Sequence, residues 1–305
     1  MIDNIKILDC TLRDGGYVNN YQFTADQTKQ IVMGLDAANI PYIETGHAQG
    51  VGAMKKGLGD AAESDEVYMK VAAESTNQSK WGMLYLTNVS SLEDIDMGAD
   101  HEIDFIRVGV EVDDIKSLFP FVDRIKKHNI YMCCNILKSH KITSDKFCEI
   151  SKEVTNRGGD CMYIVDSTGG MLPNEVSEYA KKVKDSLPDV TLGFHGHDNL
   201  GLSSYNSLSA ISAGVEIVDT TLRGLGRSAG NTQTERFVCT LKRLGYTTGI
   251  DIAKLFDVSD VSIYPLAKHI DSLDTILGAT KTHSGSVSSD DTDTIDTLLG
   301  TFLND

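Results

Sequence analysis

The sequence has few basic residues, few prolines and no long apolar run. Its 305 residues include 28 Lys and Arg against 44 Asp and Glu, which gives a formal net charge of −16. Nucleic-acid binding requires clustered basic side chains that neutralise phosphates, so this balance argues against it. A membrane-spanning helix needs about 18 or more consecutive apolar residues, and no segment offers them. With 41% hydrophobic residues and only five prolines, the chain is typical of a globular protein rather than a disordered or fibrous one.

Secretion and disulfide signals are also missing. The N-terminal stretch MIDNIKILDC contains neither the basic nor the apolar region of a signal peptide, so we expect a cytoplasmic protein. The six cysteines include no CxxC pair, which disfavours a zinc knot. They are scattered through apolar stretches, at positions 10, 133, 134, 148, 161 and 239. We therefore expect buried free thiols in a reducing compartment rather than disulfides.

Eight short runs of β-branched and aromatic residues are present, and longer segments with helical periodicity separate them. The runs cover residues 5–9, 42–46, 80–86, 105–110, 130–136, 161–167, 191–197 and 217–224. Alternation of this kind predicts an α/β protein built from βα units. Eight such units in about 225 residues match the size of a (β/α)8 TIM barrel. A doubly wound open sheet is the alternative, because strand order is not visible in a sequence.

The C-terminal part of the chain has a different character. We expect residues 1–250 to form the catalytic barrel and residues 251–305 to form a short helical extension packed on or beside it. Residues 282–292, THSGSVSSDDT, are rich in Ser, Gly and Asp, and this composition predicts a mobile loop or a lid.

Charged and polar residues gather where the predicted strands end. In a TIM barrel the catalytic groups come from the carboxyl ends of the strands and the loops that follow them. The residues in these places are Arg13, Asp14, Glu44, His47, Arg107, Asp166, Ser167, His195, His197, Asp219 and Arg223. A passive rim would be dominated by small or apolar residues instead, so we expect the active site at this end.

His195 and His197 are the sharpest local signal. Alternate residues of a strand point the same way, so both imidazoles can face one point inside the barrel mouth. In a closed barrel only the eighth strand separates the first from the seventh, and Asp14 can then join them. A His, His, Asp set with open positions suits Mn²⁺, Mg²⁺, Co²⁺ or Zn²⁺ acting as a Lewis acid. The alternative is that the histidines hydrogen-bond within a polar barrel top without metal.

Two further features lie close to this set. Arg13, next to Asp14, can neutralise an enolate oxygen as negative charge develops there. The loop GLGRSAGN at residues 224–231 lacks the lysine of a phosphate-binding P-loop. We interpret it as a backbone loop over the metal end, with Asn231 reaching toward the ion, and a purely structural turn is the alternative.

Taken together, these segments resemble the DRE-TIM metallolyase superfamily, also called the hydroxymethylglutaryl-CoA lyase-like family. The matching segments are TLRDGG (11–16), YIETGH (42–47), YIVDSTGGMLP (163–173), FHGHDNLGL (194–202) and VDTTLRGLGRSAGNTQTE (218–235). They occur in the order and at the spacing of that family and cover nearly the whole barrel. This is far more specific than any single motif.

The resemblance implies a set of roles. A divalent ion, Mn, Mg or Co rather than Zn, is held by Asp14, His195 and His197, with Asn231 a further ligand in some branches. Arg13 stabilises an enolate, Glu44 organises Arg13, and Ser167 helps to hold the substrate. Arg107 and His47 are the other expected substrate-binding residues. The 224–231 loop contains no cysteine, unlike that of the hydroxymethylglutaryl-CoA lyases, so the 4-hydroxy-2-oxovalerate aldolase branch is the most similar.

Two departures from that branch matter. Tyr17 stands where those aldolases have an acid/base histidine, so Tyr17, His47 or His283 is expected to transfer the proton instead. Those aldolases also have a longer C-terminal domain that docks an aldehyde dehydrogenase. The present chain ends at Asp305, and we do not expect such a partner, although a homo-oligomer is compatible with the sequence.

The leading hypothesis is a metal-dependent aldolase that acts on a 4-hydroxy-2-oxo acid through a pyruvate enolate. Its partners are a small 2-oxo acid and an aldehyde. One alternative is an acyl-CoA condensing enzyme of the isopropylmalate synthase type, which THSG at residues 282–285 faintly resembles. A Schiff-base aldolase would need a desolvated lysine, for which Lys138 is the nearest candidate. A non-catalytic barrel that binds an oxo acid is the remaining alternative.

Overall fold

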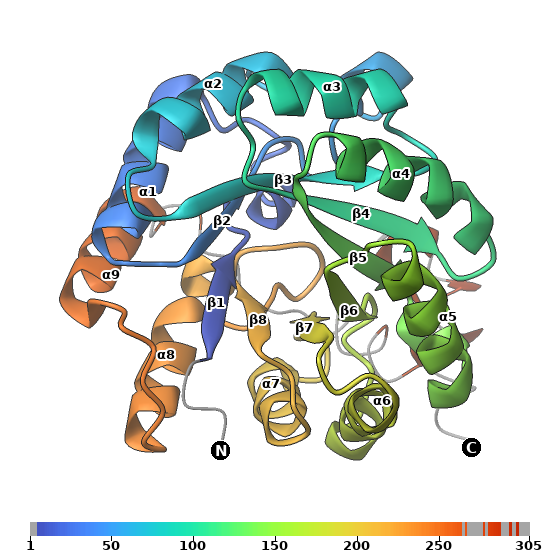
Figure 1. Cartoon of the computed structure of the whole chain (residues 1–305). Helices are drawn as coiled ribbons and strands as arrows, with labels where there is room; N and C mark the ends of the chain where they lie inside the picture. The colour runs from blue at the N-terminus through green and yellow to red at the C-terminus, as the bar shows by residue number, and fades with distance from the viewer. Residues whose placement is uncertain are drawn as a thin grey trace.

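The computed structural model describes residues 5–263, 266, 277, 280–287, 293–294 and 297–298. Within them, eight parallel strands pair in sequence order and close into a barrel, as Figure 1 shows. The strands are β1 (Lys6–Asp9), β2 (Tyr42–Thr45), β3 (Lys80–Leu86), β4 (Phe105–Glu111), β5 (Tyr131–Leu137), β6 (Cys161–Asp166), β7 (Thr191–Gly196) and β8 (Ile217–Thr220). The predicted TIM barrel is confirmed, and the open sheet is wrong.

A helix follows each strand and packs on the outside of the barrel. These helices are α1 (Ala25–Ala37), α2 (Asp65–Ser75), α3 (Leu92–Asp100), α4 (Phe119–Lys127), α5 (Ser144–Asn156), α6 (Pro173–Ser186), α7 (Ser203–Ser212) and α8 (Thr234–Arg243). Several begin at a residue that caps the helix: the Thr24 side chain accepts a hydrogen bond from the Gln27 N–H, and Thr143 accepts one from Lys146. Such caps satisfy N–H groups that lack partners within the helix. The chain therefore leaves each strand end in a defined direction.

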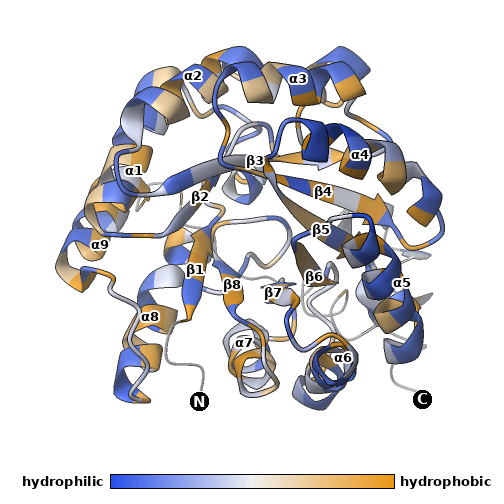
Figure 2. Ribbon diagram, viewed as in Figure 1, coloured by the Kyte–Doolittle hydropathy of each residue, from blue (hydrophilic) through white to orange (hydrophobic). Residues whose placement is uncertain are grey.

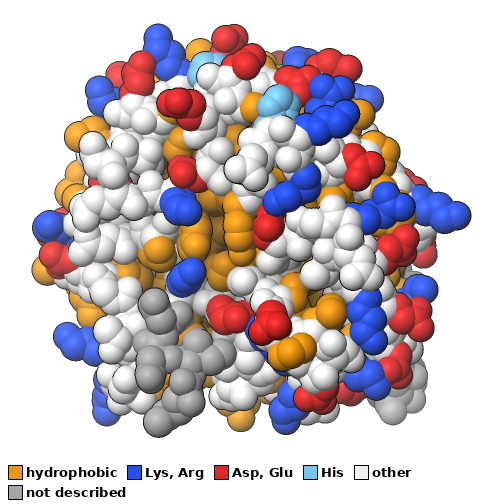
Figure 3. All heavy atoms as spheres, viewed as in Figure 1, with side chains coloured by type: hydrophobic (Ala, Val, Ile, Leu, Met, Phe, Trp, Pro, Cys, Tyr) orange, Lys and Arg blue, Asp and Glu red, His pale blue; other side chains and the backbone are white. Residues whose placement is uncertain are grey.

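Two apolar layers hold the barrel together. The larger lies between sheet and helices and includes Ile31 and Leu35 of α1, which are fully buried. In Figure 2 the helices are hydrophilic where they face solvent and hydrophobic where they face the strands. The smaller layer fills the barrel interior, with Leu8, Phe105 and Tyr163 among its members. Apolar side chains also occupy the middle of the face seen in Figure 3, so the barrel is a packed core rather than a pore.

The cysteines follow the prediction. All six are free, and five of them are buried. Cys10, Cys133 and Cys161 belong to the interior layer, where they act as small apolar side chains. None of the helices in the described part of the chain has the length and apolar character needed to cross a bilayer.

The segment after the barrel begins with one short helix, α9 (Ile252–Val258), which packs against α1. Most of residues 264–305 lie outside the described residues, so the division into a barrel of 1–250 and an extension of 251–305 stays a prediction. The same is true of the lid at 282–292, of which only 282–287 are described. Within that part, His283 lies at the carboxyl end of the barrel, where it lines the cavity described next.

Candidate active site

A cavity of about 150 Å³ lies at the carboxyl end of the barrel. Seven of the residues predicted from the sequence line it: Arg13, Asp14, Tyr17, Ser167, His195, His197 and His283. They come from the first, sixth, seventh and C-terminal segments of the chain. Barrel closure between β1 and β8 therefore brings the ends of the sequence together at one site.

A tight turn after β1 positions Arg13 and Asp14. The backbone N–H groups of both residues donate to the Cys10 carbonyl, at 3.1 and 2.8 Å, and a short 3₁₀ turn spans Asp14–Tyr17. Glycine is favoured here by close packing, because a Cβ at Gly15 would lie 3.3 Å from the Leu225 Cβ. The turn thus holds Asp14 against the loop that follows β8.

Asp14, His195 and His197 form the candidate metal set. One ligand atom from each lies within 4.8 Å of the others. The Nδ1 atom of His195 is 2.9 Å from Asp219 Oδ2, and that of His197 is 3.1 Å from the Gly230 carbonyl. Each Nδ1 therefore carries the proton that it donates, and each Nε2 is left with a lone pair. This is the form of imidazole that binds a metal.

The protonation of these residues fits the same role. Burial raises the pKa of Asp14, but Arg13 and the two neighbouring histidines outweigh it and leave the pKa below the usual range. Burial lowers the pKa of His197 to about 4, although Asp14 opposes the shift. At neutral pH the set therefore offers one carboxylate and neutral imidazole, which are the deprotonated forms that a metal requires.

Asn231 completes the set from the glycine-rich loop. Its Nδ2 donates to Asp14 Oδ2 and to the Leu225 carbonyl, while its buried Oδ1 has no hydrogen-bond partner among the described residues. An orphaned buried oxygen beside a carboxylate and two imidazoles is a natural oxygen ligand. The residues present therefore fit a divalent ion.

The glycines of this loop are also explained by close approach. A Cβ at Gly226 would lie 2.0 Å from Asn231 Nδ2 and 2.6 Å from Asp14 Oδ2. Gly230 has φ +92°, and a Cβ there would lie 2.0 Å from the Gly224 carbonyl oxygen. Side chains at either place would push the loop away from Asp14. The loop thus packs directly against the candidate metal set.

A buried chain of charges supports the site from below. Arg13 Nε donates to Glu44 Oε2 at 2.7 Å, and its Nη1 donates to Asp14 Oδ1 at 2.7 Å. Arg107 Nη1 donates to the same Glu44 oxygen at 3.0 Å, and its Nη2 donates to Asp219. Each buried charge is paired, as burial requires. Glu44 and Arg107 are absent from the cavity lining, so Arg107, predicted to bind substrate, lies in the layer beneath it.

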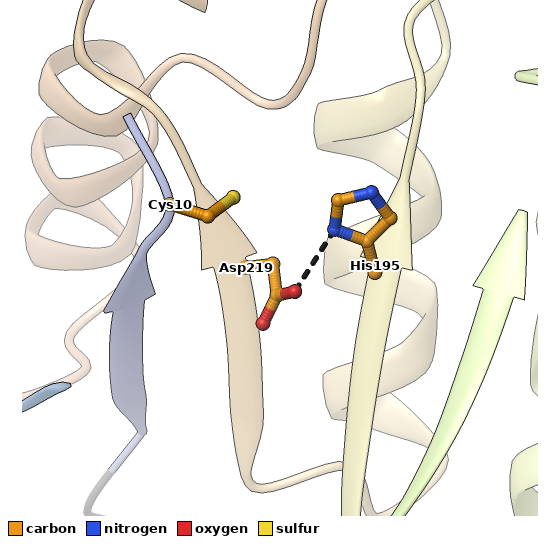
Figure 4. Close-up of side chains that lie close together, drawn as sticks. All are labelled: Cys10, His195 and Asp219. Atoms are coloured by element: carbon orange, nitrogen blue, oxygen red, sulfur yellow. Dashed lines mark hydrogen bonds and ion pairs between the residues drawn. The ribbon is translucent and has the colours of Figure 1, made fainter. Parts of the chain in front are cut away.

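A second cluster shares His195, and Figure 4 shows it. Cys10, His195 and Asp219 come from three adjacent strand ends, and the dashed line joins His195 to Asp219. Burial raises the pKa of the Cys10 thiol well above its usual range, and the Sγ donates to the Thr220 carbonyl at 3.4 Å. A thiol that keeps its proton is a poor metal ligand. Asp219 is therefore best understood as the group that orients His195 toward Asp14 and His197.

The candidates for proton transfer lie in different surroundings. Burial raises the pKa of Tyr17 to about 12, although Arg227 opposes it, so the phenol is protonated at neutral pH. Burial lowers the pKa of His283 to about 3, helped by Arg227, so its imidazole is neutral. His283 Nε2 is 2.8 Å from Arg227 Nη1, which can only donate, and this nitrogen must therefore accept. A neutral ring accepts at one nitrogen only, so the longer Gly285 N–H contact to Nδ1, at 3.2 Å, is not a second hydrogen bond.

His47 is not brought into the cavity. Its Nδ1 accepts from the Gln49 N–H at 3.0 Å, which places the proton on Nε2, and Nε2 is 3.2 Å from the Gly59 carbonyl. The ring lies 4.3 Å from that of Tyr21, centroid to centroid. With both nitrogens occupied by backbone groups, His47 holds its own loop in place.

The cavity also contains two residues that the sequence did not point to, Glu111 and Asn135, and one that it named only as a Schiff-base candidate, Lys138. Glu111, Asn135 and Lys138 all line it, and Lys138 Nζ lies 2.9 and 3.1 Å from the two oxygens of Glu111. Asn135 Oδ1 is buried without a partner among the described residues. The predicted strands stop one residue short at both places, since β4 extends to Glu111 and β5 to Leu137. The rule that strand ends carry function would have found Glu111, had that strand end been placed correctly.

Comparisons with known proteins agree with this geometry. The family model described as HMGL-like matches residues 4–261. A 4-hydroxy-2-oxovalerate aldolase of Carboxydothermus hydrogenoformans is 37% identical over 265 residues, which are 87% of this chain and 79% of that protein. An oxaloacetate decarboxylase of Mycobacterium tuberculosis is 36% identical over 253 residues, which are 83% of this chain and 74% of that protein.

Solved structures support the fold alone. An HMG-CoA lyase from Brucella melitensis superposes with a TM-score of 0.73 at 16% identity and covers 88% of this chain and 100% of that one. The carboxyl transferase domain of Rhizobium etli pyruvate carboxylase has a TM-score of 0.79 at 17% identity, over 93% of this chain and 53% of that one. With a family model that covers most of the barrel and relatives above 30% identity, this chain belongs to the HMGL-like family.

Proposed function

We propose that the chain is a divalent-metal-dependent aldolase that cleaves or forms a 4-hydroxy-2-oxo acid through a pyruvate enolate. The observation that carries the proposal is the convergence of Asp14, His195 and His197 beside Arg13 in one cavity. The relatives named 4-hydroxy-2-oxovalerate aldolase, at 32–37% identity, support it. These relatives do not favour the condensing-enzyme alternative.

Asp14, His195, His197 and Asn231 are the residues that would hold the ion. Their mixed oxygen and nitrogen donors suit Mn²⁺, Mg²⁺ or Co²⁺. When bound, the ion supplies Lewis-acid polarisation of the 2-oxo group, which makes the neighbouring C3 proton more acidic. The role of the chain is to fix these ligands, and Asp219 and Gly230 do so through the two Nδ1 atoms.

In this proposal Arg13 stabilises the enolate. Two of its N–H groups are used by Glu44 and Asp14, which hold the guanidinium rigidly at the cavity wall. Its remaining donors can face the oxygen on which negative charge grows. A donor that is already oriented needs no reorganisation during the reaction, and this preorganisation is the main source of electrostatic catalysis.

Proton transfer at C4 falls to His283 and Tyr17. In the cleavage direction His283 Nε2 exchanges the hydrogen bond from Arg227 for one from the C4 hydroxyl and takes its proton, the C3–C4 bond breaks, and its electron pair forms the enolate. Tyr17, which keeps its proton at neutral pH, donates a hydrogen bond to the same oxygen. The enolate then takes a proton at C3 to give pyruvate. Ser167 Oγ accepts from the Lys138 N–H at 3.0 Å, so its own hydroxyl can donate to the substrate carboxylate.

Oxaloacetate is a second candidate substrate, because one relative is named oxaloacetate decarboxylase. Loss of CO₂ from C4 of a 2-oxo dicarboxylate leaves the same pyruvate enolate. The same ion site and Arg13 would serve both reactions, and only the group that leaves differs.

Enolisation can be tested without knowledge of the aldehyde. Metal-loaded protein is incubated with pyruvate in D₂O, and the methyl protons are followed by NMR. We expect exchange that a chelator abolishes and that falls at least about 100-fold in His195→Ala, because electrostatic stabilisation of the enolate is lost. His128→Ala, which changes a surface histidine paired with Asp96, is the matched control and should exchange like wild type. Saturation with the ion without any exchange would disprove the proposal.

A further inference from the structure

Arg227 brings a positive charge to the cavity that no carboxylate balances among the described residues. The other cations nearby are all paired: Arg13 with Asp14 and Glu44, Arg107 with Glu44 and Asp219, and Lys138 with Glu111. Arg227 instead contacts neutral groups. Its Nη1 is 2.8 Å from His283 Nε2, and its Cζ is 5.0 Å from the centre of the Tyr17 ring.

These contacts hold the guanidinium in one place without neutralising it. The Tyr17 ring supports one face, and His283 accepts one of its five N–H donors. Gly285 leaves room for it, since a Cβ there would lie 2.7 Å from Nη2. A half-buried, oriented arginine with spare parallel donors has the geometry that recognises a carboxylate by two hydrogen bonds.

The position of Arg227 relates it to one end of the substrate. Its backbone N–H lies 3.4 Å from Asp14 Oδ2, so the residue starts beside the ion site. Its side chain then extends to Tyr17 and His283, the two groups assigned to the C4 oxygen. An anion held by Arg227 is therefore a substituent on C4, remote from the carboxylate next to the 2-oxo group.

We propose that the substrate carries a second carboxylate on C4 and that Arg227 binds it. The substrate class is a 4-hydroxy-2-oxo dicarboxylate, and the aldehyde released is itself an oxo acid such as glyoxylate. This inference rests on the proposed function. Cleavage of 4-hydroxy-2-oxoglutarate breaks C3–C4, moves the hydroxyl proton to His283 and leaves the electron pair on the pyruvate fragment. Glyoxylate then leaves with its carboxylate on Arg227.

Selectivity between two substrates tests the proposal. The values of kcat/KM for 4-hydroxy-2-oxoglutarate and 4-hydroxy-2-oxovalerate are measured with metal-loaded wild type, and their ratio is the readout. We expect wild type to favour the dicarboxylate at least about tenfold and Arg227→Gln to lose at least about tenfold of that ratio, as for the loss of a charged hydrogen bond. Arg227→Lys keeps the charge but loses the two parallel N–H donors of the guanidinium, and its selectivity ratio should lie between those of wild type and Arg227→Gln.

A matched variant separates binding from general electrostatics. Lys281→Gln removes a positive charge from the segment that contains His283, but this lysine pairs with Glu175 and is absent from the cavity lining. Its selectivity ratio should equal that of wild type. If wild type exchanges pyruvate protons but favours the monocarboxylate, or if Arg227→Gln leaves the ratio unchanged, the dicarboxylate assignment is wrong and the aldolase proposal stands. No pyruvate exchange in wild type would overturn both.

Discussion

At the scale of single residues, the site depends on buried groups that do not line the cavity. Glu44, Arg107 and Asp219 form an unbroken line of hydrogen bonds from Arg13 to His195. Because all of them are buried, their interactions are only weakly screened by solvent. The orientations of Arg13 and His195 are thereby set by one network.

Asp219→Asn tests this orienting role. The amide cannot act as a charged acceptor for His195 Nδ1, so we expect metal affinity to fall about 10- to 100-fold, which is typical when such a partner is lost. Calorimetric titration with Mn²⁺ measures the affinity, and circular dichroism checks the fold. Asp96→Asn alters a surface carboxylate that likewise contacts a histidine, His128, and should bind metal like wild type. An unchanged affinity in Asp219→Asn would rule out the orienting role.

Residue identity alone predicted the cavity-lining acid, histidines and arginine, because chemical type and strand position both pointed to them. His47 and Arg107 also lie near strand ends, but neither lines the cavity. The difference is side-chain direction: Arg107 points into the charged layer beneath the cavity, and His47 is occupied by the backbone of its own loop. A single sequence carries no signal for either contact.

At the scale of elements, α1 and α9 meet through an unusually close contact. Gly34 lies within α1, and a Cβ built on it would be 2.5 Å from Val258 Cγ2 and 2.7 Å from Val258 Cβ. Glycine in the middle of a helix costs about 1 kcal/mol relative to alanine. The chain therefore accepts a weaker helix so that α9 can approach α1.

Gly34→Ala should lower the free energy of unfolding by about 1–3 kcal/mol, since overpacking outweighs the better helix propensity. In a Val258→Ala background the same change should cost less, because the Cγ2 contact at 2.5 Å is removed while the Cβ contact at 2.7 Å remains. Urea denaturation of wild type, both single variants and the double variant gives the coupling between them. Additive effects would show that the two helices do not meet as described.

Element types were easier to predict than element ends. Alternation of apolar runs and caps such as Thr24 marks helices and strands locally, and all eight strands were found. The predicted strand 217–224 in fact ends at Thr220, because the chain turns there and Arg223 adopts a φ of 54°. That turn is imposed by the loop folding back onto Asp14, a long-range contact.

At the scale of the whole molecule, the strongly acidic chain buries several carboxyl groups, and their local surroundings differ. Asp14 and Asp219 have cationic or histidine partners, and their pKa values are lowered. Among the described residues Asp9 has no such partner: it accepts from the Thr11 N–H and the Thr234 hydroxyl, and burial raises its pKa to about 7. In the folded protein Asp9 therefore keeps a proton that the unfolded chain has already lost.

The sign of the resulting pH effect follows from linkage. Between about pH 4 and 7 the native state binds more protons at Asp9 than the unfolded state, so this group stabilises the fold less as pH rises. Asp9→Asn removes the effect. The free energy of unfolding of the variant minus that of wild type should therefore increase by about 2–3 kcal/mol from pH 5 to pH 8. Denaturant titrations at the two pH values measure this difference. The exposed Asp189→Asn should show none, and a pH-independent effect of Asp9→Asn would contradict the assignment.

The barrel and the family were predictable from the sequence because the eight βα units and the five matching segments are spread along nearly the whole barrel. The boundary at residue 250, the cytoplasmic location and the oligomeric state remain predictions.

The hydrogen bond from the Arg227 backbone to Asp14 couples binding of the ion to binding of the substrate. If the ion orders Asp14, it also orders the loop that carries Arg227. A dicarboxylate that orders Arg227 then increases the affinity of the site for the ion. Such coupling is reciprocal: whatever factor the metal adds to substrate affinity, the substrate adds to metal affinity. The preference for a dicarboxylate substrate and the affinity for the metal are then linked, and a change in one changes the other.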